Sequence, residues 1–414
     1  MALVVQKYGG TSVGDVDRIH KVAARIARNV EGGDKVAVTV SAMGRTTDGL
    51  IRLAREITPR PSRRELDVLM VTGEQQSVAL VTMALQHLGV RARSFTGAQA
   101  GFVTDGFFGG ARIREVRPDR LLAAFEDHDV AVIAGFQGVD EAGNLTTLGR
   151  GGSDTTAVAV AAALGARECE IYTDTEGVYT TDPHLIPAAT KLDAIDYDEM
   201  LELASVGAQV LHPRSVWYAR RYGVVIHVRS SFSYNTGTLV KEVKRVGELK
   251  GGDRVKTDKP VTGVALDRNH ARINLLGVPD VPGVAAQVFR ALGDAGVNVD
   301  MIIQGVPGSD ESRQQMAFTV SKDRTEDALG AVAPVLARLG GEAVADPEIA
   351  KISIVGVAVG STPGVAGRMF AAVSAVGANI EMIATSEVRI SVVIPAAQAE
   401  EALRSVHSEF GLER

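Results

Sequence analysis

The sequence predicts an α/β fold with a mostly parallel central sheet between two layers of helices, followed by two small α+β units. Short buried-strand patterns alternate with amphipathic helical patterns up to about residue 240. A polar stretch with a glycine pair follows at 245–259, and beyond it the chain repeats itself. These three observations divide the chain into residues 1–244, a linker at 245–260, and repeats at 261–341 and 342–414.

The first part alternates apolar runs with longer amphipathic stretches. The stretches at 18–29 and 77–88 have helical periodicity. Such alternation is typical of βαβ units, in which helices cover both faces of a parallel sheet. The runs expected to form buried strands are 3–5, 36–40, 130–134 and 224–228.

The second part contains a duplication, because residues 282–302 align with residues 363–383 at a constant offset. Each copy is preceded by a strand pattern and followed by a strand and a helix. The repeat therefore predicts a β-turn-α-β-β-α unit of about seventy residues, and two such units can share a groove. The identical pairs include Pro282/Pro363, Gly283/Gly364, Phe289/Phe370, Asn298/Asn379 and Ile302/Ile383.

Composition narrows the function classes. The net charge is −6 and no basic run is present, which argues against a nucleic-acid partner. Cys169 is the single cysteine, so it forms no intrachain disulfide, and its setting in a strand predicts a buried, inert thiol. The apolar start of the chain is too short for a signal peptide or a membrane span. We therefore expect a soluble protein of the reducing cytoplasm.

The first candidate site is the segment Lys7-Tyr8-Gly9-Gly10-Thr11-Ser12. A strand is expected to end at Lys7 and a helix to begin after Ser12. Two glycines allow the backbone to approach a ligand, and the helix start offers free N–H groups, which suits a phosphate. Lys7 would add a positive charge at a transferred phosphoryl group. The alternative is a simple glycine turn.

The second candidate is Gly149-Arg150-Gly151-Gly152-Ser153-Asp154, which precedes an Ala/Val-rich helix at 157–163. Ser153 or Asp154 as a helix N-cap is the structural alternative. An arginine among three glycines is harder to explain by structure alone. A guanidinium on such a loop is suited to bind a carboxylate with two hydrogen bonds.

Two further segments are candidates. Residues 173–183 follow a strand, and the carboxyl end of a parallel strand is where open α/β sheets bind ligands, although a plain loop fits as well. Glu74 either complements a helix dipole in a first turn or holds a substrate ammonium, and the sequence does not decide between the two. A P-loop, protein-kinase motifs, Gly-x-Ser-x-Gly and Cys-x-x-Cys are absent from the sequence, and no histidine pair predicts a zinc site.

In these segments the chain resembles the aspartokinases, members of the amino-acid kinase family. Residues 7–13 are similar to the family's opening motif, with Tyr8 in place of the usual Phe. Residues 149–157 match its substrate loop, and residues 173–183 resemble its nucleotide motif. Residues 41–44 and 207–213 agree as well. The repeats resemble paired, ferredoxin-like ACT domains, which bind amino-acid effectors.

The resemblance implies a role for each matching residue. The nucleotide would be held by Lys7, Tyr8, Gly9, Gly10, Ser41, Thr173, Asp174, Tyr179, Asp182 and Gln209. Aspartate would be bound by Ser41, Thr47, Glu74, Arg150, Gly151, Gly152 and Ser153. Lys7 and Asp154 would be catalytic, because Lys7 stabilises the transferred group and Asp154 organises Lys7. His184 and Gln209 depart from the family pattern, which often has basic residues at both positions.

Each repeat also offers groups for an amino-acid effector at its Pro-Gly turn and at the polar residues near the next strand. The first copy provides Asp280, Pro282, Gly283, Ala285, Asn298, Val299 and Gln304. The second provides Thr362, Asn379, Ile380, Thr385 and Ser386. Preservation of a duplicated core is the structural alternative. It explains Phe289/Phe370 better than it explains the polar pair Asn298/Asn379.

The implied reaction is phosphorylation of the side-chain carboxylate of L-aspartate by Mg-ATP, the first step of lysine, threonine and methionine biosynthesis. A carboxylate with a pKa of about 4 is already ionised, so no general base is needed. Mg²⁺ would be held mainly by phosphates and water, with no dedicated protein metal site. Threonine, lysine or both are the expected effectors. A homo-oligomer, or a complex with a separately made regulatory fragment, is the expected assembly.

Two other functions stay open at this point. One is a related kinase that acts on glutamate, an N-acylated amino acid or a nucleoside monophosphate. The other is an amino-acid-binding regulator with an inactive kinase domain, for which loss of Lys7, Arg150 or Asp154 would be the mark. All three residues are present.

Overall fold

The computed structural model describes residues 2–208, 210–243, 260–305, 313–357 and 359–413, and it forms two compact units. The first unit comprises Met1–Tyr179, Lys191–Ser205 and Gln209–Lys256. The second comprises Thr180–Thr190, Val206–Ala208 and Thr257–Arg414. Two short segments of the N-terminal half thus pack with the C-terminal half of the chain.

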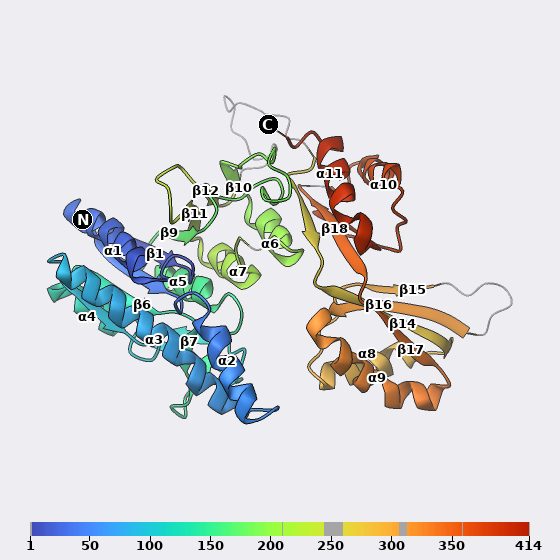
Figure 1. Ribbon diagram of the computed structural model, residues 1–414, viewed down its shortest axis with the longest axis horizontal. Coiled ribbons are helices and arrows are strands. Elements are labelled where there is room, and N and C mark those ends of the chain that lie inside the picture. Colours follow the sequence, from blue (N-terminus) through green and yellow to red (C-terminus); the bar gives the residue numbers. More distant parts are fainter. Residues whose placement is uncertain (1, 209, 244–259, 306–312, 358, 414) are drawn as a thin grey trace. The chain divides into compact units, whose positions relative to one another are not determined.

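The first unit is built on an eight-stranded sheet (Figure 1). β11 and β12 are antiparallel, and every other neighbouring pair in this sheet is parallel. The predicted parallel-rich α/β sheet is therefore confirmed. In spatial order the strands are β10 (Ala194–Ile195), β12 (Thr238–Val240), β11 (Val225–Ser230), β9 (Glu168–Thr173), β1 (Leu3–Tyr8), β2 (Lys35–Val40), β6 (Val130–Ala134) and β3 (Ala92–Phe95).

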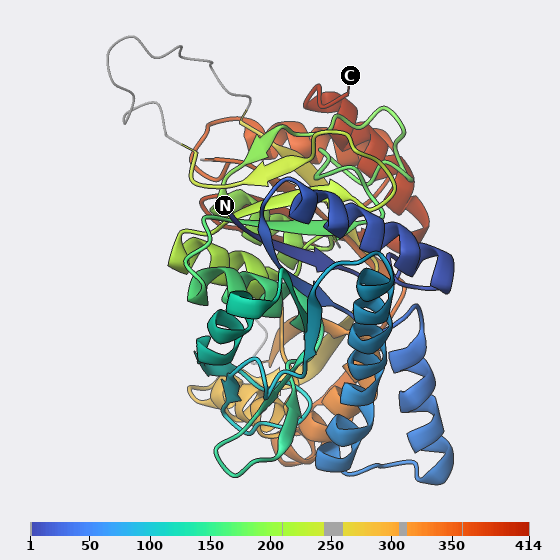
Figure 2. The same ribbon diagram turned by 90° about the vertical axis from the view of Figure 1, so that its left-hand side faces the viewer.

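Helices cover both faces of this sheet, with α1 and α3 on one side and α5 and α7 on the other (Figures 1 and 2). Alternate residues of the strands pack with apolar residues of α1 and α3 in one core, as period-two strands between helices require. The helices are α1 (Val16–Glu31), α2 (Thr46–Ile57), α3 (Arg63–His87), α4 (Asp119–Asp127), α5 (Gly152–Ala163), α6 (Tyr197–Ser205) and α7 (Pro213–Tyr222).

α3 is long and apolar enough to span a membrane, the only such helix in the described part of the chain. Its apolar window is 56% buried within the protein. It packs against α1 and against a second, four-stranded sheet with the order β5-β4-β7-β8. Packing in the core therefore explains its composition. The strands of the small sheet are β4 (Phe102–Thr104), β5 (Ile113–Val116), β7 (Gln137–Val139) and β8 (Leu145–Thr147).

The second unit contains two four-stranded sheets with the orders β15-β16-β14-β17 and β13-β18-β20-β19. Their paired strands are antiparallel, as expected for two α+β repeats. The first sheet contains β14 (His270–Pro279), β15 (Ile302–Gln304), β16 (Arg313–Ser321) and β17 (Glu342–Asp346). The second contains β13 (Gly263–Asp267), β18 (Ile349–Val355), β19 (Met382–Thr385) and β20 (Arg389–Pro395).

The two repeats exchange strands. β13 lies in the range expected for the first repeat but pairs with β18 of the second, whereas β17 lies in the range expected for the second repeat but pairs with β14 of the first. The sheets therefore cross the sequence boundary expected at residue 341. The helices of the two repeats are α8 (Val284–Asp294), α9 (Thr325–Leu339), α10 (Val365–Ala375) and α11 (Ala399–Glu409), and short 3₁₀ turns η2 (Lys322–Arg324) and η3 (Ala396–Gln398) precede α9 and α11.

Candidate active site

The candidate site lies where parallel strands β1, β2, β6 and β9 end. Tyr8 at the end of β1 is in register with Val40 of β2 and Tyr172 of β9, and Val40 is in register with Ala134 of β6. The loops after these strands therefore share one edge of the sheet. They include the predicted segments that begin at Lys7, Ser41 and Thr173.

The glycine loop after β1 packs tightly against the loop after β2. A Cβ atom on Gly10 would lie 2.8 Å from the carbonyl oxygen of Ala42, so only glycine fits there. A Cβ atom on Gly9 would lie 3.4 Å from Lys7 Nζ. The following helix begins at Val16 with Asp15 as its N-cap, and not directly after Ser12 as the sequence predicted. Thr11, Ser12 and Val13 form a turn between the strand and the helix.

Lys7 and Asp154 form an ion pair, with Lys7 Nζ 2.6 Å from Asp154 Oδ1. Their side chains are only 12% and 11% exposed. Asp154 lies in the first turn of α5, where the helix dipole favours a carboxylate. The N-cap position is occupied by Gly151, so the structural alternative, in which Ser153 or Asp154 caps the helix, is wrong. The pair places one cation and one anion at the strand edge.

Arg150 is presented between two glycines in left-handed conformation. Gly149 has φ 73° and Gly151 has φ 66°. A Cβ atom on Gly151 would lie 2.1 Å from Cβ of His212, which explains this glycine by packing. Arg150 is exposed, and in the described part of the chain its guanidinium has neither a hydrogen bond nor an ion pair. A free guanidinium on a fixed loop is available for an anionic ligand.

The remaining residues of this loop are packed into the fold. Gly152 and Ser153 begin α5 and are buried. A Cβ atom on Gly152 would lie 2.9 Å from Phe136 Cδ2, and one on Gly135 would lie 2.7 Å from Ser153 Oγ. The loop after β6 and the start of α5 are thus closely fitted to one another.

Glu74 is buried in the middle of α3 and not in a first turn, so the dipole alternative is wrong. Its Oε1 accepts a hydrogen bond from the backbone N–H of Ala42 at 3.1 Å. Its Oε2 has no hydrogen-bond partner among the described residues. Burial raises the pKa of Glu74 to about 7. A buried acid with one free oxygen is typical of a ligand site.

Ser41 directly precedes Ala42, whose N–H binds Glu74, and Thr47 belongs to α2, which packs against α3. The backbone N–H of Ser41 donates to Tyr8 O at 3.1 Å, which ties the loops after β1 and β2 together. Thr47 is the second residue of α2 and is partly buried. Tyr8 is fully buried, and its ring stacks on that of Tyr172 with a centroid separation of 4.7 Å. Tyr8 therefore belongs to the core beneath the glycine loop.

The predicted nucleotide segment is divided between the two units. Thr173 ends β9, and its Oγ1 accepts from the backbone N–H of Thr175 at 3.0 Å. Asp174 is exposed, and Tyr179 is partly buried within the first unit. Asp182 belongs to the second unit, where it accepts a hydrogen bond from the backbone N–H of His184 at 2.9 Å. Gln209 lies outside the described residues.

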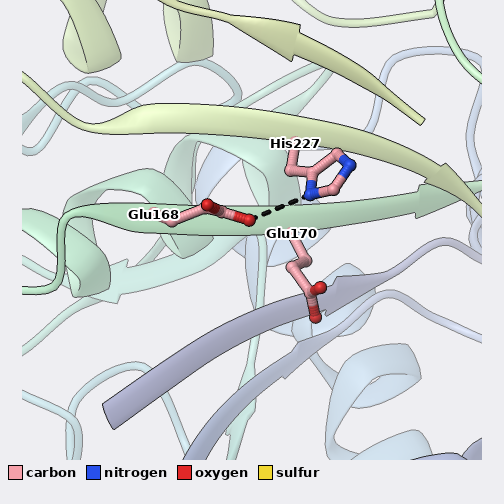
Figure 3. Close-up of side chains that lie close together, drawn as sticks. All are labelled: Glu168, Glu170 and His227. Carbon is pink, nitrogen blue, oxygen red and sulfur yellow. Dashed lines mark hydrogen bonds and ion pairs between the residues drawn. The ribbon is translucent and has the colours of Figure 1, made fainter. Parts of the chain in front are cut away.

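Glu168, Glu170 and His227 lie close together on β9 and β11 (Figure 3). The dashed line in Figure 3 joins Glu168 Oε1 and His227 Nδ1, and these two atoms lie 2.9 Å apart. Glu170 accepts hydrogen bonds from Gln6 at 2.8 Å, Tyr172 at 3.1 Å and Arg229 at 2.7 Å. These donors already satisfy the Glu170 carboxylate, so the cluster is explained as a strand-to-strand polar network.

In the second unit, a cavity of about 270 Å³ is lined by residues 278–285 with Gln304 and Met316. Five predicted effector residues are among its lining residues: Asp280, Pro282, Gly283, Ala285 and Gln304. Gly283 has φ 97° as the N-cap of α8, and Gly364 has φ 87° as the N-cap of α10. The repeated glycine is therefore required by backbone geometry in both copies.

The other predicted effector residues lie around the corresponding turns. Asn298 is exposed, whereas Val299 packs against the apolar core of the first repeat. Thr362 precedes the N-cap of α10, and Thr385 ends β19. Asn379, Ile380 and Ser386 flank β19.

Several residues that position the site have no recognisable sequence signal. His212 is the N-cap of α7 and packs against Gly151. Arg214 Nη1 donates to Leu148 O at 2.7 Å, next to the Arg150 loop. Asp67 accepts hydrogen bonds from backbone N–H groups of Gly109 and Thr147. The one available hint is that Asp67 precedes Glu74 by seven positions, which places both on one face of a helix.

Comparison with protein families divides the chain into an N-terminal part and a C-terminal part. Residues 2–230 match the amino acid kinase family. Residues 272–338 and 352–410 each match an ACT domain family.

Individual proteins match over the whole chain. The chain is 65% identical over 414 residues to an aspartokinase of Thermus thermophilus, covering 100% of both chains. Its structure is similar to that of E. coli aspartokinase III in complex with aspartate and ADP, with a TM-score of 0.80, 26% identity and 99% coverage of both chains. The complex of E. coli aspartokinase III with lysine and aspartate matches with a TM-score of 0.72 at 26% identity, covering 99% of both chains.

Proposed function

This chain belongs to the amino acid kinase family, as an aspartokinase with two ACT domains, and from this premise we propose how its residues divide the reaction. The protein is an ATP-dependent kinase that acts on the carboxylate of aspartate. The products are 4-phospho-L-aspartate and ADP. The observation that carries the proposal is the buried Lys7–Asp154 ion pair, with an unpaired Arg150 four positions before Asp154 in the chain, because these groups supply the charges that the transfer requires.

The reaction is mainly a problem of bringing two anions together. The β-carboxylate of aspartate is ionised at neutral pH, since the pKa of such a group is about 4. Its oxygen attacks the γ-phosphorus as the bond to the ADP oxygen breaks. No proton has to be removed, so the residues contribute position and positive charge.

We assign Lys7 to the transferred phosphoryl group. Its ammonium lies at the edge of the sheet beside the glycine loop Gly9-Gly10, whose backbone is able to approach phosphate oxygens. Asp154, 2.6 Å away, fixes the ammonium in place and so acts as its organiser. Tyr8 supports this loop from the core, and Ser41, Thr173, Asp174, Tyr179 and Asp182 are assigned to the nucleotide.

The amino-acid side of the site consists of Arg150 and Glu74. The free guanidinium of Arg150 suits the α-carboxylate of aspartate, and the buried carboxylate of Glu74 suits its ammonium. Ser41 lies on the loop that contacts Glu74 through Ala42, and Thr47 lies on α2, which packs against α3. Gly151, Gly152 and Ser153 hold the Arg150 loop at the start of α5.

The side chains at this site fit a Mg²⁺ ion only if the ion is bound mainly to the phosphates of ATP. The described residues group no three carboxylate or histidine side chains at the Lys7 edge of the sheet. Phosphate oxygens and water would therefore hold the ion, which would supply charge neutralisation.

The ACT pair is assigned to feedback control by threonine, lysine or both. The cavity at the start of α8 combines a helix N-terminus with Asp280 and the Gln304 amide, which together suit an α-amino acid. Control by these amino acids fits an enzyme at the first step of lysine, threonine and methionine biosynthesis. A cytoplasmic homo-oligomer, or a complex with a separately made regulatory fragment, is the assembly that we propose.

The test is a kinase assay on the purified chain with Mg-ATP and either L-aspartate, L-glutamate or N-acetyl-L-glutamate. ADP release and trapping of the acyl phosphate by hydroxylamine are measured together. We expect both signals with aspartate and neither with the other acceptors. An equal signal with glutamate would refute the assigned specificity, and absence of any aspartate-dependent ADP would refute the activity.

A further inference from the structure

Asp67 is a buried carboxylate that is held by hydrogen bonds and not by an ion pair with any described residue. It is 0% exposed in α3, and no described residue forms an ion pair with it. Instead its oxygens accept hydrogen bonds from the backbone N–H of Gly109 at 3.1 and 3.0 Å, the backbone N–H of Thr147 at 2.9 Å and Thr147 Oγ1 at 2.7 Å. Burial of an acid is costly unless hydrogen bonds satisfy it, so Asp67 depends on these donors and in turn holds them in place.

The donors to Asp67 lie at the base of the Arg150 loop. Thr147 is the last residue of β8, three positions before Arg150. Gly109 is close to Gly149, because a Cβ atom on Gly149 would lie 3.3 Å from Gly109 O. The backbone N–H of Ala111 donates to Thr147 O at 2.8 Å. The Asp67 carboxylate therefore holds both segments that support the start of this loop.

The loop base is also fixed from other sides. The backbone N–H of Leu148 donates to Phe136 O at 2.8 Å, and Leu148 O accepts from Arg214 at 2.7 Å. Arg150 itself is exposed, its guanidinium has no hydrogen-bond or ion-pair partner among the described residues, and its neighbours Gly149 and Gly151 carry no side chain. A guanidinium with no direct protein partner depends on its backbone for its position.

Asp67 and Glu74 share one face of α3, because a spacing of seven positions returns to nearly the same side of a helix. Glu74 binds the loop after β2 through Ala42, and Asp67 binds the base of the Arg150 loop. One rigid helix thus sets the separation between the two groups assigned to the amino acid.

We infer that Asp67 is a positioning residue for aspartate binding, which acts through the backbone of the Arg150 loop. This inference rests on the proposed function of Arg150. Misplacement of a binding group by about 1 Å can cost up to a hundredfold in rate, so a residue remote from the substrate can still determine its binding.

The direct test is Asp67→Asn. The amide keeps the size of the side chain but turns an NH₂ group toward N–H donors, so part of the clamp is lost. We expect the KM for aspartate to rise between about ten- and a hundredfold, with the KM for ATP within twofold of the parent. Thr146→Val is the matched control. It removes a buried hydroxyl of the same strand that pairs with Thr104 Oγ1 at 2.8 Å and does not bind Asp67, so both KM values should stay within twofold.

A double-mutant cycle with Arg150→Ala separates positioning from general structural support. If Asp67 acts through Arg150, adding Asp67→Asn to Arg150→Ala should change the KM for aspartate by less than twofold. Equal effects in both backgrounds would overturn the inference, as would an unchanged KM in Asp67→Asn itself.

A milder variant keeps the test decisive if Asp67→Asn fails to fold. Thr147→Val removes only the 2.7 Å hydroxyl contact and should raise the KM for aspartate severalfold in the same selective manner. A KM for aspartate within twofold of the parent would then overturn the inference. An inactive parent enzyme would instead refute the proposed function.

Discussion

Thr180 Oγ1 lies 2.9 Å from Nε2 of His407, a residue 227 positions further along the chain. Thr180 Oγ1 also donates to Leu412 O at 3.1 Å, and Ile186 packs in the apolar core of the second ACT repeat. The segment Thr180–Thr190 is therefore part of the regulatory unit, although it directly follows Tyr179 in the segment assigned to the nucleotide. The regulatory unit is thus directly continuous in the chain with the segment proposed to bind the nucleotide.

The first prediction concerns the stability of this connection. Burial lowers the pKa of His407, opposed by the nearby Glu413, so His407 gains a proton more readily in the unfolded than in the folded protein. The contribution of this group to stability is therefore present above its ordinary pKa of about 6.5 and is lost as pH falls. We expect His407→Gln to lower the Tm less at pH 5.5 than at pH 7.5. An equal loss at both pH values would contradict a neutral buried histidine.

The second prediction concerns Lys7. Lys7→Ala removes the ammonium assigned to the transferred phosphoryl group and leaves Asp154 unpaired. Loss of one such electrostatic stabiliser typically costs roughly 10²–10³ in rate. We expect kcat to fall by this factor while the circular dichroism spectrum is unchanged. Lys35→Ala is the control, because it removes a partly buried Lys–Asp pair of 3.0 Å outside the site. Turnover of Lys7→Ala within threefold of the parent would exclude the assignment.

The third prediction is a pH profile that depends on Glu74. Burial raises the pKa of this acid to about 7 in the free enzyme. Only the ionised form holds the ammonium of aspartate, so kcat/KM for aspartate should rise with pH through about 7 and then level off. Glu74→Gln should lower this value and remove the inflection. A parent profile that is flat between pH 6 and 8 would show that Glu74 does not titrate in substrate binding.

The fourth prediction separates the two substrates. Arg150→Lys keeps the charge but loses the planar, two-pronged geometry of the guanidinium. We expect the KM for aspartate to rise much more than the KM for ATP, as measured by varying each substrate at saturation of the other. An equal rise for both would mean that Arg150 does not hold the amino acid.

The sequence predicted the strand–helix order and the repeat because both depend on local apolar patterns. Buried strands such as β6 (Val130–Ala134) are recognisable by composition, and the repeated Pro-Gly turns mark the two helix starts. Helix limits were less accurate. The apolar pattern marked a helix only from residue 77, whereas α3 begins at Arg63. The pattern missed this start because buried polar residues such as Asp67 and Glu74 interrupt it.

Other features depend on contacts that no local pattern reveals. Lys7 and Asp154 are far apart in sequence and meet only because β1 and α5 pack together. Asp67 binds mainly backbone N–H groups, which leave no trace in the sequence of their own residues. The segment Thr180–Thr190 likewise belongs to the regulatory unit because of long-range packing, which no local pattern reveals.

The long-range packing also decides how regulation should be tested. Deletion of residues after about 250 should weaken inhibition more than catalysis in the simplest view. The deletion would, however, remove the partners of Thr180 and Ile186 and expose a segment next to the nucleotide residues. Point variants in the ACT pair are therefore the sharper test.

The last prediction is that threonine, lysine or both inhibit the enzyme through the cavity at the start of α8. Gln304 lines this cavity, and Asn298 lies between α8 and β15. Changing both to Ala should weaken inhibition with little effect on the uninhibited rate, and a coupling of about 1–3 kcal/mol is typical of such control. Asn379→Ala is the matched variant in the second repeat. If it weakens inhibition more than the double variant does, the effector binds at the second repeat. Activity is measured with zero to several millimolar effector. A parent rate and KM that neither amino acid alters, singly or together, would exclude regulation and leave the ACT pair an assembly role.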